Sequence, residues 1–164
     1  DWAPGMDHVV NAIDKLAPMP GDVVIDFGCG TGRATAAFKQ HYLLPVGVDL
    51  AGNALEEHVT FVNANLWDLP PLKELFGAQW GFCCDVMEHI PTEKVSDVLS
   101  GIAKNVPSGA YFCIDSVPDR QGLIIGQPLH MTVRPPEWWS EELSKHFAHV
   151  EQYDGGVFVC FHKR

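Results

Sequence analysis

Residues 23–32 read VVIDFGCGTG and carry the strongest indication of the fold class. Its first half is apolar and rich in β-branched side chains, which is typical of a short strand covered on both faces in a parallel sheet. Its second half alternates glycine with other residues, so the chain turns sharply there and presents bare backbone to a ligand. A helix is expected to follow, from about Arg33 to Tyr42. A strand, a glycine-rich turn and a helix in this order predict the first unit of a doubly wound α/β sheet.

The rest of the chain repeats this alternation of strands and helices. The predicted helices cover residues 6–17, 33–42, 71–76, 92–106 and 137–147. The predicted strands cover residues 23–27, 45–50, 59–63, 80–84, 110–116, 148–153 and 156–162. Residues 51–58, between the second and third predicted strands, are too few for a full crossover helix, so we expect a very short helix or a loop there. Residues 154–156 (Asp-Gly-Gly) predict a hairpin turn between the last two strands. We therefore expect one α/β domain over residues 1–164, with a Rossmann-like, doubly wound, seven-stranded sheet and a C-terminal antiparallel hairpin strand.

Composition narrows the classes of partner. Hydrophobic residues make up 46% of the chain and charged residues 20%, as in an ordinary soluble domain. No apolar stretch approaches the roughly 20 residues that span a bilayer, and no signal segment is present, so we expect a cytoplasmic protein with no membrane partner. The formal charge is −10 and the basic residues are scattered, which argues against a long nucleic acid and favours a small molecule. The five cysteines lack the spacing of a zinc site and are expected to be reduced.

Two acids beside the glycine turn indicate what the loop binds. Dinucleotide enzymes use the spacing G-x-G-x-x-G, whereas here the glycines alternate and Arg33 follows. Asp26 stands two residues before the first glycine, where it would repel a pyrophosphate but suit a positive amino group. Asp49 ends the next strand, where a carboxylate accepts hydrogen bonds from the two hydroxyls of a ribose.

Four segments in order, DFGCGTG, GVDL, FVNANLWDLP and FCCDVMEHIP, resemble the motifs of the class I S-adenosylmethionine-dependent methyltransferases. The resemblance runs from Val23 to Lys163 and implies S-adenosylmethionine as the cofactor. Asn65 stands where many relatives have an Asp that contacts the adenine amino group. It either makes that contact or only caps a turn. The resemblance implies that Asp26 and the loop residues Gly28, Cys29, Gly30 and Gly32 bind the methionine part of the cofactor. It implies that Asp49, next to Leu50, binds the ribose and that Asn65 and Leu66 bind the adenine. Asp85 and Val86 would line the reacting end of the cofactor.

Two carboxylates and two imidazoles are the candidates for the chemistry. Asp85, Glu88 and His89 follow the fourth strand, at the edge where ligands bind in such sheets, and His130 lies in the long connector 117–135. The pattern D-x-x-E-H with a later His is similar to the E-x-x-E-H plus His arrangement of small-RNA 2′-O-methyltransferases and to the E-x-x-E-H of quinone-biosynthesis O-methyltransferases. That resemblance implies a divalent metal on Asp85, Glu88, His89 and His130. One alternative is that His130 or His89 acts as a general base without a metal. Another is that Glu88 and His89 only stabilise the loop after the fourth strand.

The leading hypothesis is methyl transfer from S-adenosylmethionine to a hydroxyl of a small molecule, because a hydroxyl needs a base and the histidines offer one. A nitrogen acceptor and the ribose of an RNA stay open. So does a non-catalytic subunit that only binds the cofactor. A dinucleotide oxidoreductase is disfavoured by the glycine spacing. Trp2 is a candidate lid over the cofactor.

Overall fold

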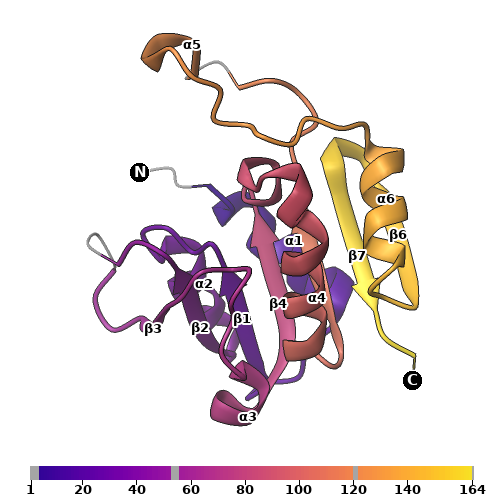
Figure 1. Ribbon diagram of the computed structural model, residues 1–164. Helices are drawn as coiled ribbons and strands as arrows, with labels where there is room; N and C mark the ends of the chain where they lie inside the picture. Colours follow the sequence, from indigo (N-terminus) through magenta and orange to yellow (C-terminus); the bar gives the residue numbers. More distant parts are fainter. Residues whose placement is uncertain (1–3, 53–55, 120–121, 164) are drawn as a thin grey trace.

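A single seven-stranded sheet with helices on both faces forms the molecule in the computed structural model, which describes residues 4–52, 56–119 and 122–163 (Figure 1). Trp2 lies outside these residues. The strand order β3-β2-β1-β4-β5-β7-β6 confirms the predicted doubly wound sheet. The strands are β1 (Val23–Phe27), β2 (Leu44–Asp49), β3 (Thr60–Asn63), β4 (Ala78–Cys84), β5 (Gly109–Cys113), β6 (His149–Tyr153) and β7 (Val157–Phe161).

Strand pairing divides the sheet into a parallel part and a terminal hairpin. β1 pairs in parallel with both β2 and β4, and β4 pairs in parallel with β5. β7 runs antiparallel to its two neighbours, β5 and β6, which confirms the predicted C-terminal hairpin. The carboxyl ends of β1, β2, β4 and β5 therefore meet at one edge of the sheet.

The helices cover the two faces of the sheet unequally. On one face α1 and α2 pack over Val24, Phe82 and Tyr111. On the other face α4 and α6 bury Trp139 and Leu143 in a larger apolar cluster. The helices of four or more residues are α1 (Val9–Leu16), α2 (Arg33–Phe38), α3 (Leu72–Phe76), α4 (Val95–Asn105), α5 (Gly122–Ile125) and α6 (Pro136–Ser144). Among the described residues, no helix is both long and apolar enough to cross a membrane.

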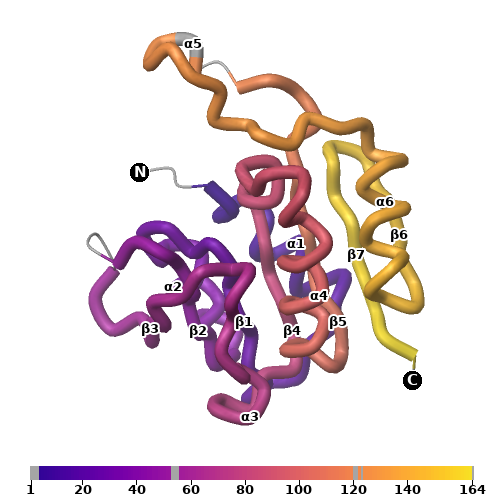
Figure 2. Tube along the Cα trace, in the orientation of Figure 1, coloured from indigo at the N-terminus to yellow at the C-terminus, as the bar shows by residue number. Residues whose placement is uncertain are grey.

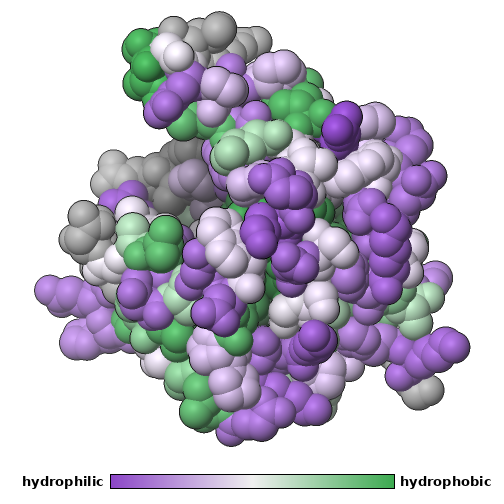
Figure 3. Space-filling view, viewed as in Figure 1, coloured by the Kyte–Doolittle hydropathy of each residue, from purple (hydrophilic) through white to green (hydrophobic). Residues whose placement is uncertain are grey.

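The segment after β5 differs most from its predicted course. The sequence predicts that the strand continues to Ser116, but it ends at Cys113, because both neighbouring strands stop there: Cys113 pairs with the last residue of β4, Cys84, and the first residue of β7, Val157. The amide of Ile114 still donates to the carbonyl of Gly156 in the β6–β7 turn (2.9 Å). The connector then extends as an arm beyond the carboxyl ends of the strands (Figure 2). Ile124 in its helix α5 is 84% exposed. Figure 3 shows green, hydrophobic side chains at this end of the arm.

The contact between the β6–β7 turn and β5 gives a test of the fold. Gly155 and Gly156 both have φ near +70°, but a Cβ at Gly156 would overlap the carbonyl oxygen of Ile114, whereas a Cβ at Gly155 meets nothing. We expect Gly155→Ala to lower the free energy of unfolding by about 1 kcal/mol through backbone strain alone. Gly156→Ala should cost about 3 kcal/mol because the clash adds to the strain. Urea denaturation measures both, and equal losses would show that the turn does not press against β5.

Candidate functional site

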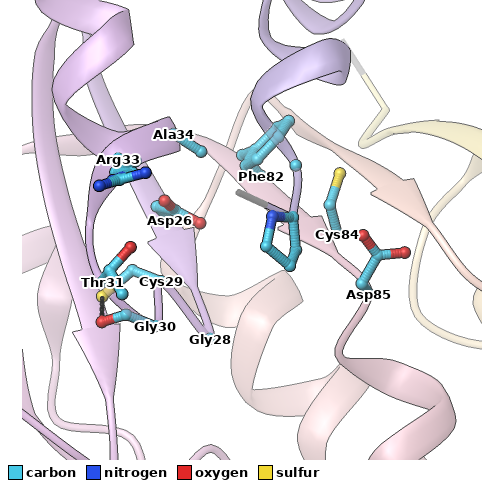
Figure 4. A pocket seen from close by; sticks show the side chains of 12 residues that line it. Asp26, Gly28, Cys29, Gly30, Thr31, Arg33, Ala34, Phe82, Cys84 and Asp85 are labelled. Carbon is cyan, nitrogen blue, oxygen red and sulfur yellow. Dashed lines mark hydrogen bonds between the residues drawn. The ribbon is translucent and has the colours of Figure 1, made fainter. Parts of the chain in front are cut away.

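A cavity of about 570 Å³ opens at the carboxyl ends of β1 and β4. Its lining includes Gly28 and Gly30 from the glycine loop, Asp26 from β1, and Phe82 and Asp85 from β4 or its end. Figure 4 shows Asp26 pointing into the space between the loop on one side and the end of β4 on the other. The order of the strands reverses between β1 and β4, which is where open α/β sheets bind ligands.

The glycine loop takes a shape that other residues would strain. Gly28, Gly30 and Gly32 all have positive φ, between +53° and +78°. A Cβ at Gly28 would overlap the side chain of Val86, so this glycine lets the loop approach the segment that follows β4. The amide of Gly28 donates to the carbonyl of Val48 on β2 (2.8 Å), which holds the loop against the neighbouring strand.

Asp26 is a buried acid that has one side-chain partner among the described residues. It is 3% exposed, and the hydroxyl of the fully buried Thr35 on α2 donates to its Oδ2 (2.5 Å). Burial raises the pKa of Asp26 to about 7, against the lowering effect of the Thr35 hydrogen bond. A buried acid of this kind favours a ligand that brings a positive charge.

Asp49 shapes the loop from the end of β2. Its Oδ2 accepts a hydrogen bond from the amide of Gly30 and its Oδ1 one from the amide of Ala51, both at 2.9 Å. Each carboxylate oxygen has a second lone pair, so both can still accept from a ligand hydroxyl. Asp49 therefore holds the glycine loop against the end of β2, and its oxygens can accept further hydrogen bonds, although Asp49 is not among the residues that line the cavity.

The other predicted cofactor residues take different positions. Cys29 lines the cavity, and burial raises its thiol pKa to about 12, which leaves no thiolate for nucleophilic chemistry. Leu50 is exposed, and Leu66 is buried in the cluster under α4. Asn65 Oδ1 accepts from the amide of Trp67 (3.3 Å), a turn contact.

Asp85 sits at the end of β4 in a backbone conformation that non-glycine residues rarely adopt, with φ +55°. Its amide donates to the carbonyl of Cys113 on β5 (3.0 Å), which holds this turn in place. Burial raises the pKa of Asp85 above its usual range, while the imidazole of His8 acts in the opposite direction. The half-buried Val86 continues the turn against Gly28.

Glu88, His89 and His130 come together although His130 lies far along the chain. One ligand atom of each lies within 4.8 Å of the others, and the two imidazole rings are 4.9 Å apart between centroids. Asp85, the fourth predicted metal ligand, is not a member of this group. The connector is held there because the amides of Met131 and Thr132 donate to the carbonyl of Glu88 (2.8 and 2.9 Å).

The hydrogen bonds of the two imidazoles determine which nitrogen is free. Nδ1 of His89 lies 3.0 Å from the carbonyl oxygen of Leu129, and Nδ1 of His130 lies 2.7 Å from that of Val117. A carbonyl oxygen only accepts, so each neutral ring carries its proton on Nδ1 and its lone pair on Nε2. Both Nε2 atoms are thereby available to a metal or to a proton.

Glu88 completes the cluster as a buried acid. It is 1% exposed, and burial raises its pKa to about 7. Oε1 accepts from the amide of Asp115 (3.3 Å), but Oε2 is buried and has no partner among the described residues. A carboxylate and two imidazoles with free lone pairs form a donor set that suits a divalent cation, and Oε2 is the atom that lacks a partner without one.

The sequence hypothesis missed three residues of this region. Thr35 holds Asp26, Asp115 donates to Glu88, and His8 contacts Tyr111 and acts on Asp85. Asp115 lies at the end of the predicted fifth strand, near the edge where Asp85 follows the fourth, a signal that could have identified it. Thr35 and His8 lie inside amphipathic helical segments, whose pattern gives no such signal.

Comparisons with known proteins agree on one family. The family described as "Methyltransferase domain" matches residues 25–114. A magnesium-protoporphyrin O-methyltransferase of Synechocystis is 29% identical over 106 residues, which are 60% of this chain and 46% of that protein. The chain thus spans about half the length of this curated relative.

Solved structures of methyltransferases share the fold. A 1,6-didemethyltoxoflavin-N1-methyltransferase from Burkholderia thailandensis, with its acceptor and S-adenosylhomocysteine bound, aligns at a TM-score of 0.69 and 19% identity over 98% of this chain and 79% of that one. A sugar N-methyltransferase from Streptoalloteichus aligns at 0.72 and 16% identity over 100% and 89%. The Synechocystis magnesium protoporphyrin IX methyltransferase with S-adenosylhomocysteine aligns at 0.71 and 19% identity over 96% and 81%.

The Asp26–Thr35 pair predicts a stability change that depends on pH. The folded pKa of about 7 exceeds the ordinary value of 3.8, so the stability that Asp26 contributes is full below about pH 4 and is lost as pH rises through 7. Thr35→Val removes the donor to the charged form, so we expect a loss of about 1 kcal/mol at pH 5 and about 2–3 kcal/mol at pH 8. Urea denaturation at both values measures it, with Thr35→Ser as the control that keeps the hydroxyl. Equal losses at the two pH values would contradict an ionising Asp26.

Proposed function

The chain belongs to the class I S-adenosylmethionine-dependent methyltransferases, and we propose that it transfers the methyl group to a hydroxyl of a small molecule. The single observation that carries the choice of a hydroxyl is the pair of imidazoles whose Nδ1 atoms are tied to backbone carbonyls, with both Nε2 lone pairs free beside the buried Glu88. A hydroxyl must lose its proton to become a good nucleophile, and this cluster is built to assist that loss.

We propose that the cofactor occupies the 570 Å³ cavity with its amino group towards Asp26. The positive amino group would stabilise the carboxylate form of this buried acid. The loop residues Gly28, Cys29, Gly30 and Gly32 would contact the methionine part through their backbone, because the three glycines carry no side chain that would keep a ligand away from the main chain. The cofactor methyl group would then face the end of β4.

The remaining cofactor contacts follow from the ends of β2 and β3. Asp49 would accept hydrogen bonds from the ribose hydroxyls beside Leu50, because its two oxygens keep free lone pairs. Asn65 and Leu66 lie on the segment after β3 and are proposed to border the adenine. Asp85 and Val86 would border the sulfur and its methyl group from the end of β4.

Glu88, His89 and His130 are proposed to hold a divalent cation. The fit rests on Glu88 Oε2, since two imidazoles that act only as bases would not need a buried carboxylate oxygen without a partner. When bound, the cation would lower the pKa of an acceptor hydroxyl. Backbone carbonyls on the far side of both rings would orient the ligand nitrogens.

The reaction itself requires position more than further groups. A bond forms between the acceptor oxygen and the methyl carbon as the bond from that carbon to sulfur breaks, which leaves S-adenosylhomocysteine. Asp85 lines the cavity and also interacts electrostatically with His89 and His130, so the two reactants would be held in line beside it. If the cluster binds no cation, an Nε2 atom of His89 or His130 would accept the hydroxyl proton instead.

Asp49→Asn tests the cofactor contacts. The amide nitrogen cannot accept, so one loop contact and one ribose contact are lost, and the affinity for S-adenosylhomocysteine should fall about tenfold or more by calorimetry. Asp22→Asn is the matched control, because Asp22 accepts from the Met19 amide and Trp80 Nε1 before the amino end of β1. It should affect stability without changing affinity. A folded Asp49→Asn protein with unchanged affinity would exclude this role.

His130→Ala tests the proposed chemistry. Turnover of hydroxylated small molecules with isotopically labelled S-adenosylmethionine should fall about a hundredfold or more, whereas affinity for S-adenosylhomocysteine stays the same. His149→Ala, on the exposed outer strand β6, is the matched control. Chelation should abolish turnover of the unaltered protein if a cation is used, and spare it if an imidazole is the base. Methyl label found only on nitrogen would contradict a hydroxyl acceptor.

A further inference from the structure

Asp85 borders two cavities rather than one. Besides the cofactor cavity, it lines a second cavity of about 410 Å³. The second cavity lies at the end of β5 and is lined by residues 113–117, by Pro136 and by the glycines of the β6–β7 turn. Any molecule that fills it lies next to the end of the cofactor cavity that Asp85 borders.

The polar side chains of this second cavity are all hydrogen-bond acceptors or hydroxyls. They are Asp85, Asp115 and Ser116, and neither lysine nor arginine is among the described residues that line it. Oδ1 of Asp115 accepts from the amide of Val117 (3.0 Å), which fixes the carboxylate in place. Ser116 Oγ is buried and has no partner among the described residues, so it has unused hydrogen-bonding capacity.

The charge of the second cavity is negative without compensation from its own lining. Asp85 and Asp115 both line this cavity, and two carboxylates that share a site repel each other. The chain as a whole carries −10, which also attracts cations. Binding of a cation between Asp85 and Asp115 would relieve this repulsion.

We propose that the second cavity holds the methyl acceptor, and that the acceptor carries a protonated amine bound by Asp85, Asp115 and Ser116. The inference rests on the proposed function, which brings the cofactor methyl group to the Asp85 turn. An ammonium group offers three N–H donors, which two carboxylates and one hydroxyl oxygen can accept. Asp115 and Ser116 thus become residues that determine specificity.

The same geometry separates the bound nitrogen from the methylated atom. A protonated amine has no lone pair and cannot attack the methyl carbon, so another atom of the acceptor must do so. The amide of Asp115 donates to Glu88 Oε1, which places the second cavity beside the Glu88 cluster. The proposed acceptor is therefore an amine that also carries a hydroxyl, such as an amino alcohol or a phenol with an aminoalkyl side chain.

Two catechols that differ only in the amine test this inference by binding. Dopamine carries a protonated amine, and 4-ethylcatechol has the same ring and carbon chain without it. Calorimetry on the complex of the protein with S-adenosylhomocysteine should show dopamine binding at least about tenfold more tightly. Asp115→Asn should remove most of that preference and leave the affinity for 4-ethylcatechol unchanged.

Glu57→Gln is the control for long-range attraction. It removes the same charge from a side chain that is 95% exposed on the loop after β2, so it should leave the preference for dopamine intact. Equal affinity for the two catechols, or failure of dopamine to bind at millimolar concentration, would overturn the inference, as would a preference that survives in folded Asp115→Asn. Preferential binding of dopamine without transfer of label to its hydroxyls would instead support the inference and count against the proposed function.

Discussion

The reversal of strand order beside β1 sets the position of the candidate site and of the segments around it. β1 pairs with β2 on one side and β4 on the other, so the chain leaves the carboxyl ends of these strands in opposite directions. Neither connection covers the crevice between them. The cavity beside Asp26, the glycine loop against Val86 and the turn at Asp85 all lie at this point.

Within the part of the chain that the structure describes, the buried acids near this crevice keep hydrogen-bond acceptors without partners, which does not stabilise the folded protein. Asp26 has the Thr35 hydroxyl as its side-chain donor, and Glu88 has an oxygen without a partner among the described residues. Buried acids of this kind raise the free energy of the folded protein, whereas apolar side chains of similar size would not. Their presence is physically reasonable if ligands supply the missing partners, an amino group for Asp26 and a cation for the Glu88 cluster.

Local sequence patterns predicted the structure correctly where neighbouring residues alone set the conformation of a strand or a turn. The apolar run of β1 followed by alternating glycines predicted both the strand and the turn, because each requirement is set by neighbouring residues. The end of β5 was placed three residues too far, since the strand stops where its neighbours β4 and β7 stop pairing with it, at Cys113. Distant segments set that limit, so no local period contains it.

Short sequence patterns predicted the order of the strands and of the helices other than α5, the glycine loop, and which acids and imidazoles follow the strand ends. These depend on backbone preference and apolar period within short windows. The packing of the chain places Glu88 in the interior, brings His130 of the connector to it, leaves Asp85 outside their cluster, and gives Asp115 a cavity in common with Asp85. These relations are set by how segments remote in sequence pack at one edge of the sheet. Side-chain distance there depends on the path of the whole chain.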